Sequence, residues 1–126
     1  MRKELLVTLV FIAMLAAALV NVCCIEALAD EVTSLVEAAA DLMLAGDTIS
    51  AEERATEAFR LWQSHGAYLN MVLKHSVFEA CESDLIALLT EAYAGNAAGV
   101  LGMTEAVRRS MEAAVASERI RAASIF

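Results

Sequence analysis

Proline is absent from the 126 residues of this chain, and glycine occurs only five times. Because proline and glycine are the residues that most often mark turns, their scarcity leaves few positions at which a sheet protein could reverse direction. The abundant residues, among them Ala, Leu, Glu, Met and Arg, are good helix formers. These features argue against a β-sandwich, a doubly wound sheet or a collagen-like chain, and they predict an all-α fold.

Basic residues are also scarce. The chain has nine Lys and Arg residues against 17 Asp and Glu residues, which gives a formal net charge of −8. Nucleic-acid binding depends on cationic side chains that neutralise phosphates. We therefore expect no nucleic-acid partner.

One long apolar run is present. Residues 5–25 carry no charge, and Thr8 and Asn21 are their only polar residues apart from cysteine. As a helix this run would be about 32 Å long, and the hydrocarbon core of a bilayer is about 30 Å thick. Arg2 and Lys3 precede the run, whereas no Lys or Arg follows it until Arg54. By the positive-inside rule, residues 1–25 are predicted to be a single-pass membrane anchor with a cytoplasmic N-terminal side. Residues 26–126 are then an extracytoplasmic domain, and residues 5–25 contact the lipid bilayer.

A cleaved signal peptide is the alternative interpretation of the same segment. Ala27-Leu28-Ala29 has the small-x-small form of a signal-peptidase site, so cleavage near Ala29 would release a secreted domain. The apolar part of a signal peptide is usually about 7 to 15 residues long. The run here is longer, and Glu26 lies close to the cleavage position, so the anchor is favoured. Both interpretations send the domain to the same side of the membrane.

The outer end of the apolar run carries three polar or reactive residues. Cys23 and Cys24 lie there, far from the third cysteine, Cys81. Three cysteines do not make a disulfide framework, and neither Cys23 nor Cys24 is preceded by the residues typical of a lipoprotein. Two interpretations stay open. Cys23 and Cys24 are either unmodified cysteines at the level of the membrane, or one of them is acylated or forms an intermolecular disulfide. Asn21 could bond to a partner helix, but a place at the head-group boundary is favoured.

Four amphipathic helices are predicted after the anchor. Apolar residues repeat at steps of three and four in residues 26–45, 50–75, 78–92 and 97–115. Gly46 and Gly95 are the predicted stops, and Ser50 and Ser76 each begin a predicted capping box. Because short connections favour antiparallel neighbours, we expect an antiparallel bundle of about four helices.

The charge along the chain supports this order. Residues 26–53 contain eight acids and no base, and four arginines follow Ala106. In a closed bundle the first and last helices are neighbours, so their opposite charges favour the pairing. The last helix would then end near the bilayer, where Arg119, Arg121 and Phe126 are expected to contact the membrane surface. A frayed, solvated terminus is the simpler alternative.

No catalytic or metal-binding motif is evident. His65 and His75 are ten residues apart and do not share a face of one continuous helix, and neither belongs to an HExxH or Cys/His motif. There is no Gly-x-Ser-x-Gly elbow and no phosphate-binding glycine loop. We therefore expect no metal, no cofactor and no enzymatic activity. An enzyme that uses His65 or His75 with a nearby carboxylate is the least favoured alternative.

The second half of the chain carries a family resemblance. Trp62 lies in the second predicted helix, an apolar stretch from Leu69 to Leu73 leads to His75, and an acidic Leu-rich helix follows. With its Ile-Phe tail after arginines, the chain resembles the bacterial domain-of-unknown-function family 4363 from about Val32 onward. This chain departs from the family pattern in being rich in alanine and poor in lysine. The resemblance implies a short anchor, a helical domain and no catalytic residues.

Within that resemblance, Trp62 and His75 are the characteristic residues, and both suit structural roles. Trp62 is expected in the core, and the ring of His75 is expected to cap backbone groups at a helix junction. The sequence thus predicts a membrane-anchored bundle at the bacterial cell envelope that acts as a non-enzymatic interaction or structural module, with a protein partner that the sequence does not identify. The alternative is a secreted bundle that binds a small apolar ligand between its helices.

Overall fold

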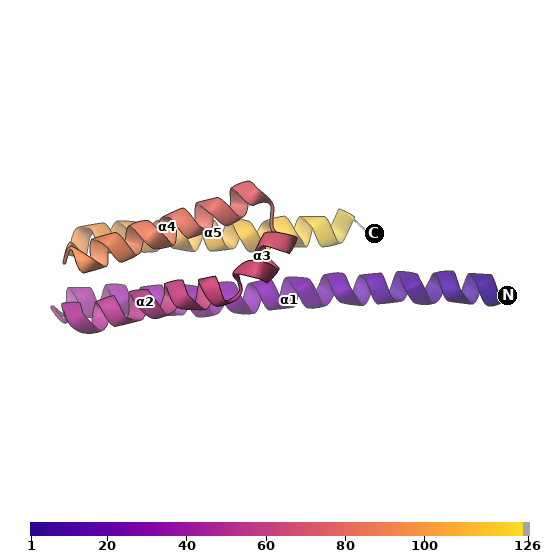
Figure 1. Ribbon diagram of the computed structural model, residues 1–126, viewed down its shortest axis with the longest axis horizontal. Helices are drawn as coiled ribbons and strands as arrows, with labels where there is room; N and C mark the ends of the chain where they lie inside the picture. Colours follow the sequence, from indigo (N-terminus) through magenta and orange to yellow (C-terminus); the bar gives the residue numbers. More distant parts are fainter. Residues whose placement is uncertain (125–126) are drawn as a thin grey trace.

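The computed structural model describes residues 1–124, which form five helices and contain no strand (Figure 1). The all-α prediction is therefore confirmed for this part of the chain. The helices are α1 (Arg2–Leu44), α2 (Thr48–Ser64), α3 (Gly66–Val72), α4 (His75–Tyr93) and α5 (Ala97–Ser124).

Helix α1 is continuous over 43 residues. It joins the predicted anchor to the first predicted helix of the domain without a break, because no glycine or proline lies between Arg2 and Leu44. At 1.5 Å per residue the helix is about 65 Å long. Its N-terminal half, the free half of α1, projects beyond the other helices except that the end of α5 lies beside residues 14–21, and its C-terminal half packs among the helices (Figure 1). Ile25 is the first buried side chain along α1.

The helices form a bundle in which each long helix has two neighbours. Helix α1 packs against α2 and α5, and α4 packs against the same two helices. The C-terminal end of α5 and the free half of α1 point in the same direction (Figure 1). The short helix α3 lies between α2 and α4 at this end of the bundle.

The core is apolar and is built from all five helices. Small alanines line the buried face of α2, where they permit close approach of neighbouring helices. The largest core side chain is Trp62. The buried hydrophobic residues are Ile25, Leu28, Ala29, Val32, Val36, Ala39, Ala40, Met43, Ala51, Ala55, Ala58, Trp62, Leu69, Leu73, Phe78, Cys81, Leu85, Leu88, Ala92, Val100, Val107, Met111 and Ala114.

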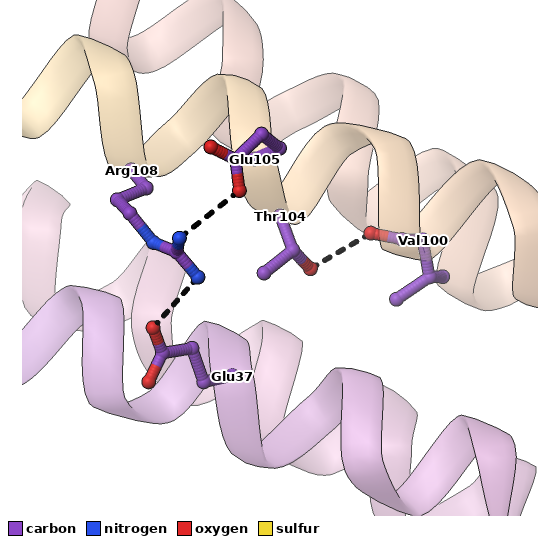
Figure 2. Close-up of polar contacts among 5 residues, drawn as sticks. All are labelled: Glu37, Val100, Thr104, Glu105 and Arg108. Atoms are coloured by element: carbon purple, nitrogen blue, oxygen red, sulfur yellow. Dashed lines mark hydrogen bonds and ion pairs between the residues drawn. The ribbon is translucent and has the colours of Figure 1, made fainter.

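The acidic first helix and the arginine-bearing last helix lie side by side. Arg108 of α5 reaches Glu37 of α1 at 3.1 Å and Glu105 of its own helix at 3.1 Å (Figure 2). Beside them, the buried hydroxyl of Thr104 donates to the carbonyl of Val100 at 2.7 Å, which satisfies it within α5 (Figure 2). These ion pairs are partly exposed and contribute about 0 to 1 kcal/mol each, so burial of the apolar faces dominates the stability.

Both predicted glycine stops are confirmed. Gly46 follows the end of α1 with φ of +84°, and Gly95 follows the end of α4 with φ of +69°. A residue with a Cβ atom rarely adopts this left-handed conformation, whereas glycine adopts it at no steric cost. The chain therefore reverses at these two positions with short connections.

The two predicted capping boxes are wrong. Helix α2 begins at Thr48, and the carboxylate of Asp47 accepts from the amide of Ser50 at 3.2 Å. Asp47 is as good an N-cap as serine and lies three residues earlier, so it captures the amide that Ser50 itself carries. Helix α4 begins at His75, before Ser76, and Lys74 occupies its N-cap position without a side-chain hydrogen bond.

The predicted second helix is also interrupted, which the sequence reading did not anticipate. It stops after Ser64, and α3 begins at Gly66. The hydroxyl of Ser64 donates to the carbonyl of Leu61 at 2.7 Å, and Nδ1 of His65 lies 3.0 Å from the same oxygen. Side chains that bond to the backbone in this way compete with the helical ladder. After Val72 the chain turns into extended backbone at Leu73, which lets α4 start in a new direction.

Candidate functional site

Trp62 is a core residue, as predicted. Its side chain is buried, and its ring stacks on Phe78 of α4 with centroids 5.5 Å apart and an interplanar angle of 26°. Stacked aromatic pairs stabilise a fold beyond their buried area. The pair therefore joins α2 to α4 close to the α3 junction.

His75 does not cap the helix junction, and that part of the prediction is wrong. Its side chain is 79% exposed, and Nε2 lies 2.9 Å from the Oε1 atom of Glu79, one turn along α4. His65 bonds instead within its own turn, to Leu61 and Ser64. The two histidines thus have separate surroundings. Residues 1–124 bring no three His, Cys, Asp or Glu side chains together in a group that could hold a metal ion.

The arginines predicted to contact the membrane differ in their surroundings. Arg119 pairs with Glu26 of α1 at 2.9 Å. Arg121 donates to the backbone carbonyl of Val72, at the end of α3, at 2.6 Å. Phe126 lies outside the described residues. Membrane contact by these residues stays a prediction.

A polar cluster with one buried carboxylate lies where the free half of α1 meets the bundle. At its centre is Glu118 of α5, which is only 1% exposed. Asn21 of α1 donates from Nδ2 to Oε2 of Glu118 at 2.8 Å. The hydroxyl of Tyr68, on α3, donates to Oδ1 of Asn21. The cluster therefore connects α1, α3 and α5 at one point.

Arg121 supplies the positive charge of this cluster. One of its guanidinium nitrogens lies 3.7 Å from Oε1 of Glu118, an oxygen with no hydrogen-bond partner among the described residues. The contact is thus an ion pair without a hydrogen bond. Burial, followed by the nearby Cys24 and Glu118, raises the pKa of the Tyr68 hydroxyl, so Tyr68 stays a neutral donor.

The sequence reading missed this cluster. The sequence predicts Asn21 at the head-group boundary, with a bond to a partner helix as the alternative, and the structure adds a bond to Glu118 of the same chain. Glu118 is not among the predicted site residues, although it continues the buried stripe of α5. The steps from Val107 through Met111 and Ala114 to Glu118 are four, three and four. That spacing was the available signal, because it predicts a buried carboxylate that needs a partner.

A cavity of about 290 Å³ adjoins the cluster. It is lined by polar atoms of the cluster on one side and by small and apolar side chains of α1 and α5 on the other. The lining residues are Met14, Ala17, Ala18, Asn21, Glu118, Arg121 and Ala122. The cavity lies at the level where α5 ends and α1 continues alone.

Cys81 is a buried thiol within the core. Burial, with a smaller effect of Asp84, raises its pKa to about 12. Its Sγ atom donates to the carbonyl of Ser110 at 3.4 Å, and the hydroxyl of Ser110 donates to Asp84. A thiol with this pKa is protonated at neutral pH and is a poor nucleophile.

No protein-family model, curated protein or solved structure matches this chain. The resemblance to family 4363 is therefore an expectation from the sequence alone.

Proposed function

We propose that this protein is a single-pass membrane protein of the bacterial cell envelope. Residues at the start of α1 anchor it, and an antiparallel bundle of four long helices forms an extracytoplasmic domain. The domain acts as a non-enzymatic interaction or structural module. The polar cluster fixes the angle between the anchor and the bundle.

The free half of α1 carries this proposal. Helix α1 is long and apolar enough to cross a membrane, and the most apolar 18-residue stretch has no buried residue. Large apolar side chains are exposed all around it, including Leu5, Leu9, Ile12, Leu19 and Val20. An apolar helix that no protein surface covers is expected to be covered by lipid.

The buried contacts of α1 support retention of the anchor over cleavage near Ala29. Cleavage would remove Ile25 and Leu28 from the core. It would also remove Asn21 and Glu26, the partners of Glu118 and Arg119. A buried carboxylate that loses its hydrogen-bond partner is strongly unfavourable. The secreted form therefore lacks groups that the folded bundle uses.

The distribution of charge supports the orientation. Arg2 and Lys3 precede the apolar segment, and the acidic C-terminal half of α1 follows it. Basic residues favour the cytoplasmic side. The bundle would thus lie on the opposite side of the membrane.

The experiment introduces one charge into each half of α1. Ile12→Arg places arginine near the centre of the free segment, which costs about 2.5–3.5 kcal/mol in membrane insertion. Ser34→Arg adds the same charge at an exposed position of the bundle half. We expect the wild type and Ser34→Arg to resist carbonate extraction, and Ile12→Arg to be extracted. Release of all three proteins from the membrane by carbonate would contradict the anchor.

Intact mass and protease digestion test the two remaining parts of the proposal. An intact mass that includes residues 1–29 is expected, whereas a protein that starts at Asp30 would favour the secreted alternative. External protease should digest the bundle in spheroplasts. Protection of the bundle would overturn the orientation.

A further inference from the structure

Arg121 also lines a groove that is separate from the 290 Å³ cavity at Asn21 and Glu118. The groove has a volume of about 570 Å³ and runs between the α3–α4 connection and the last turns of α5. Lys74 and Arg121 contribute two cationic side chains to its lining, and Ser117 and Ser124 contribute two hydroxyl groups. Cations and hydroxyls of this kind are the usual ligands of phosphate.

The positive charge of this groove is only partly neutralised within the chain. Lys74 has no ion-pair partner among residues 1–124. Arg121 lies 3.7 Å from Glu118, the one carboxylate with which it pairs. Two cations and one carboxylate leave a net charge of +1 at this point. The surplus is notable in a chain whose formal net charge is −8.

The depth of the groove relative to the anchor identifies the source of phosphate. If Lys3 marks the inner boundary, a hydrocarbon core about 30 Å thick ends about 20 residues later, near residue 23. Arg121 shares a cavity wall with Ala18 and Asn21. On this scale Ala18 and Asn21 lie about 3 to 8 Å inside the hydrocarbon boundary, so Arg121 lies at the inner edge of the head-group region. From Arg121 the groove extends back along α5 as far as Ala113, toward the level of the lipid phosphates. This step rests on the proposed anchor.

We propose that the groove of Lys74 and Arg121 binds the phosphate of an anionic phospholipid. Lys74 contacts the phosphate as a mobile point charge. Arg121 is held in place by the carbonyl of Val72, at 2.6 Å, and by Glu118. Ser117 donates its hydroxyl group to a remaining phosphate oxygen, whereas the hydroxyl of Ser124 donates to the carbonyl of Ile120 at 2.8 Å. The bound lipid would hold the lower end of α5 against the membrane.

The test compares lipid binding by the full-length protein. Wild type and variants are reconstituted in phosphatidylcholine alone or in an equal mixture with phosphatidylglycerol, and bound lipids are measured by native mass spectrometry. We expect the wild type to retain phosphatidylglycerol in preference to phosphatidylcholine. Each cation near a membrane surface contributes about a fivefold factor, so K74Q should lower the preference about fivefold and K74Q/R121Q about thirtyfold.

A matched control removes the same charge elsewhere. R54Q/R109Q also deletes two positive charges, but Arg54 and Arg109 line neither the groove nor the 290 Å³ cavity. This control should keep the preference of the wild type. K74Q is expected to fold normally, because Lys74 is exposed and its side chain makes no hydrogen bond to the described residues. A loss of lipid preference in K74Q is therefore not explained by misfolding. An unchanged preference in both K74Q and K74Q/R121Q would overturn the proposal, as would an equal loss in the control.

Two further measurements separate the sources of failure. In the first, inorganic phosphate is added to the delipidated protein in detergent. If phosphate stabilises the protein as much as phosphatidylglycerol does, the ligand of the groove is free phosphate and the lipid proposal is overturned. The reconstituted wild type is also extracted with carbonate. Release from the vesicles would overturn the anchor and the lipid site together, whereas retention without lipid preference would overturn the lipid site alone.

Discussion

Asn21 and Glu118 are separated by 97 positions in the sequence and joined by a hydrogen bond of 2.8 Å. Asn21 belongs to the segment that the sequence assigns to the membrane, and Glu118 belongs to the last helix of the bundle. Glu118 is buried and Asn21 is half-buried, so the bond satisfies a carboxylate oxygen that has little access to water. It therefore fixes how the free half of α1 leaves the bundle.

Removal of the Asn21 amide is expected to destabilise the fold. In Asn21→Ala, Oε2 of Glu118 loses its hydrogen bond, and the carboxylate keeps only the 3.7 Å ion pair between its Oε1 atom and Arg121. A buried acceptor left without a partner costs about 1–3 kcal/mol. Asn70→Ala, at an exposed position of α3, is the control. Denaturant unfolding in mild detergent, followed by helical circular dichroism, measures both, and equal stabilities would contradict the importance of the bond.

The helices were predictable because their signals are local. The three- and four-residue spacing of apolar residues and the glycines at 46 and 95 depend only on neighbouring positions. Capping was less predictable, because Asp47 and Ser50 are both good N-caps and only the geometry decides between them. The break after Ser64 was missed because it depends on side chains that bond to one carbonyl, that of Leu61.

The candidate site was less predictable than the helices for a different reason. Glu118 and Asn21 are ordinary polar residues in their own segments. They form a site only because the packing of α1 against α5 brings them together. The sequence predicted that the first and last helices are neighbours from their charges, but not their register. A one-turn shift would put Glu118 opposite another residue. The register of α5 against α1 is set by the whole packed interface, so no short motif predicts it.

Truncation of Trp62 is expected to be the most damaging single change in the core. Trp62→Ala removes the stacking on Phe78 and leaves a cavity, which costs about 3–5 kcal/mol. Trp62→Phe keeps an aromatic ring and should cost less. Thermal unfolding of the two variants by circular dichroism measures the order. A Trp62→Ala protein as stable as Trp62→Phe would contradict the packing role of the ring.

Asp47 is expected to make the stability of α2 depend on pH. Hydrogen bonds with Ser50 lower the pKa of the Asp47 carboxyl below 3.8 in the folded protein. The folded pKa is lower than the unfolded one, so the stabilisation is complete above about pH 4 and is lost as pH falls through the folded pKa. In Asp47→Asn the amide oxygen still caps the helix without titrating.

The measurement for Asp47 is the difference in melting temperature between wild type and Asp47→Asn from neutral pH down to acid pH. The other carboxylates titrate equally in both proteins and cancel in this difference. We expect the wild type to lose stability relative to Asp47→Asn as the pH falls below 4. A constant difference over this range would mean that the cap carries no charge-dependent contribution.

Cys81 is expected to be unreactive in the folded protein. Burial raises the pKa of its thiol to about 12, so the thiolate is scarce at neutral pH, and burial also restricts access of a reagent. The background Cys23→Ser/Cys24→Ser leaves Cys81 as the single thiol. Maleimide labelling should be slow in the native state and fast in guanidinium.

The control on that background is Cys81→Ser/Ser83→Cys, which moves the thiol to an exposed position of the same helix and should label rapidly without denaturant. Similar native rates for the two thiols would show that α4 opens readily, and they would contradict the packed core between α4 and α5.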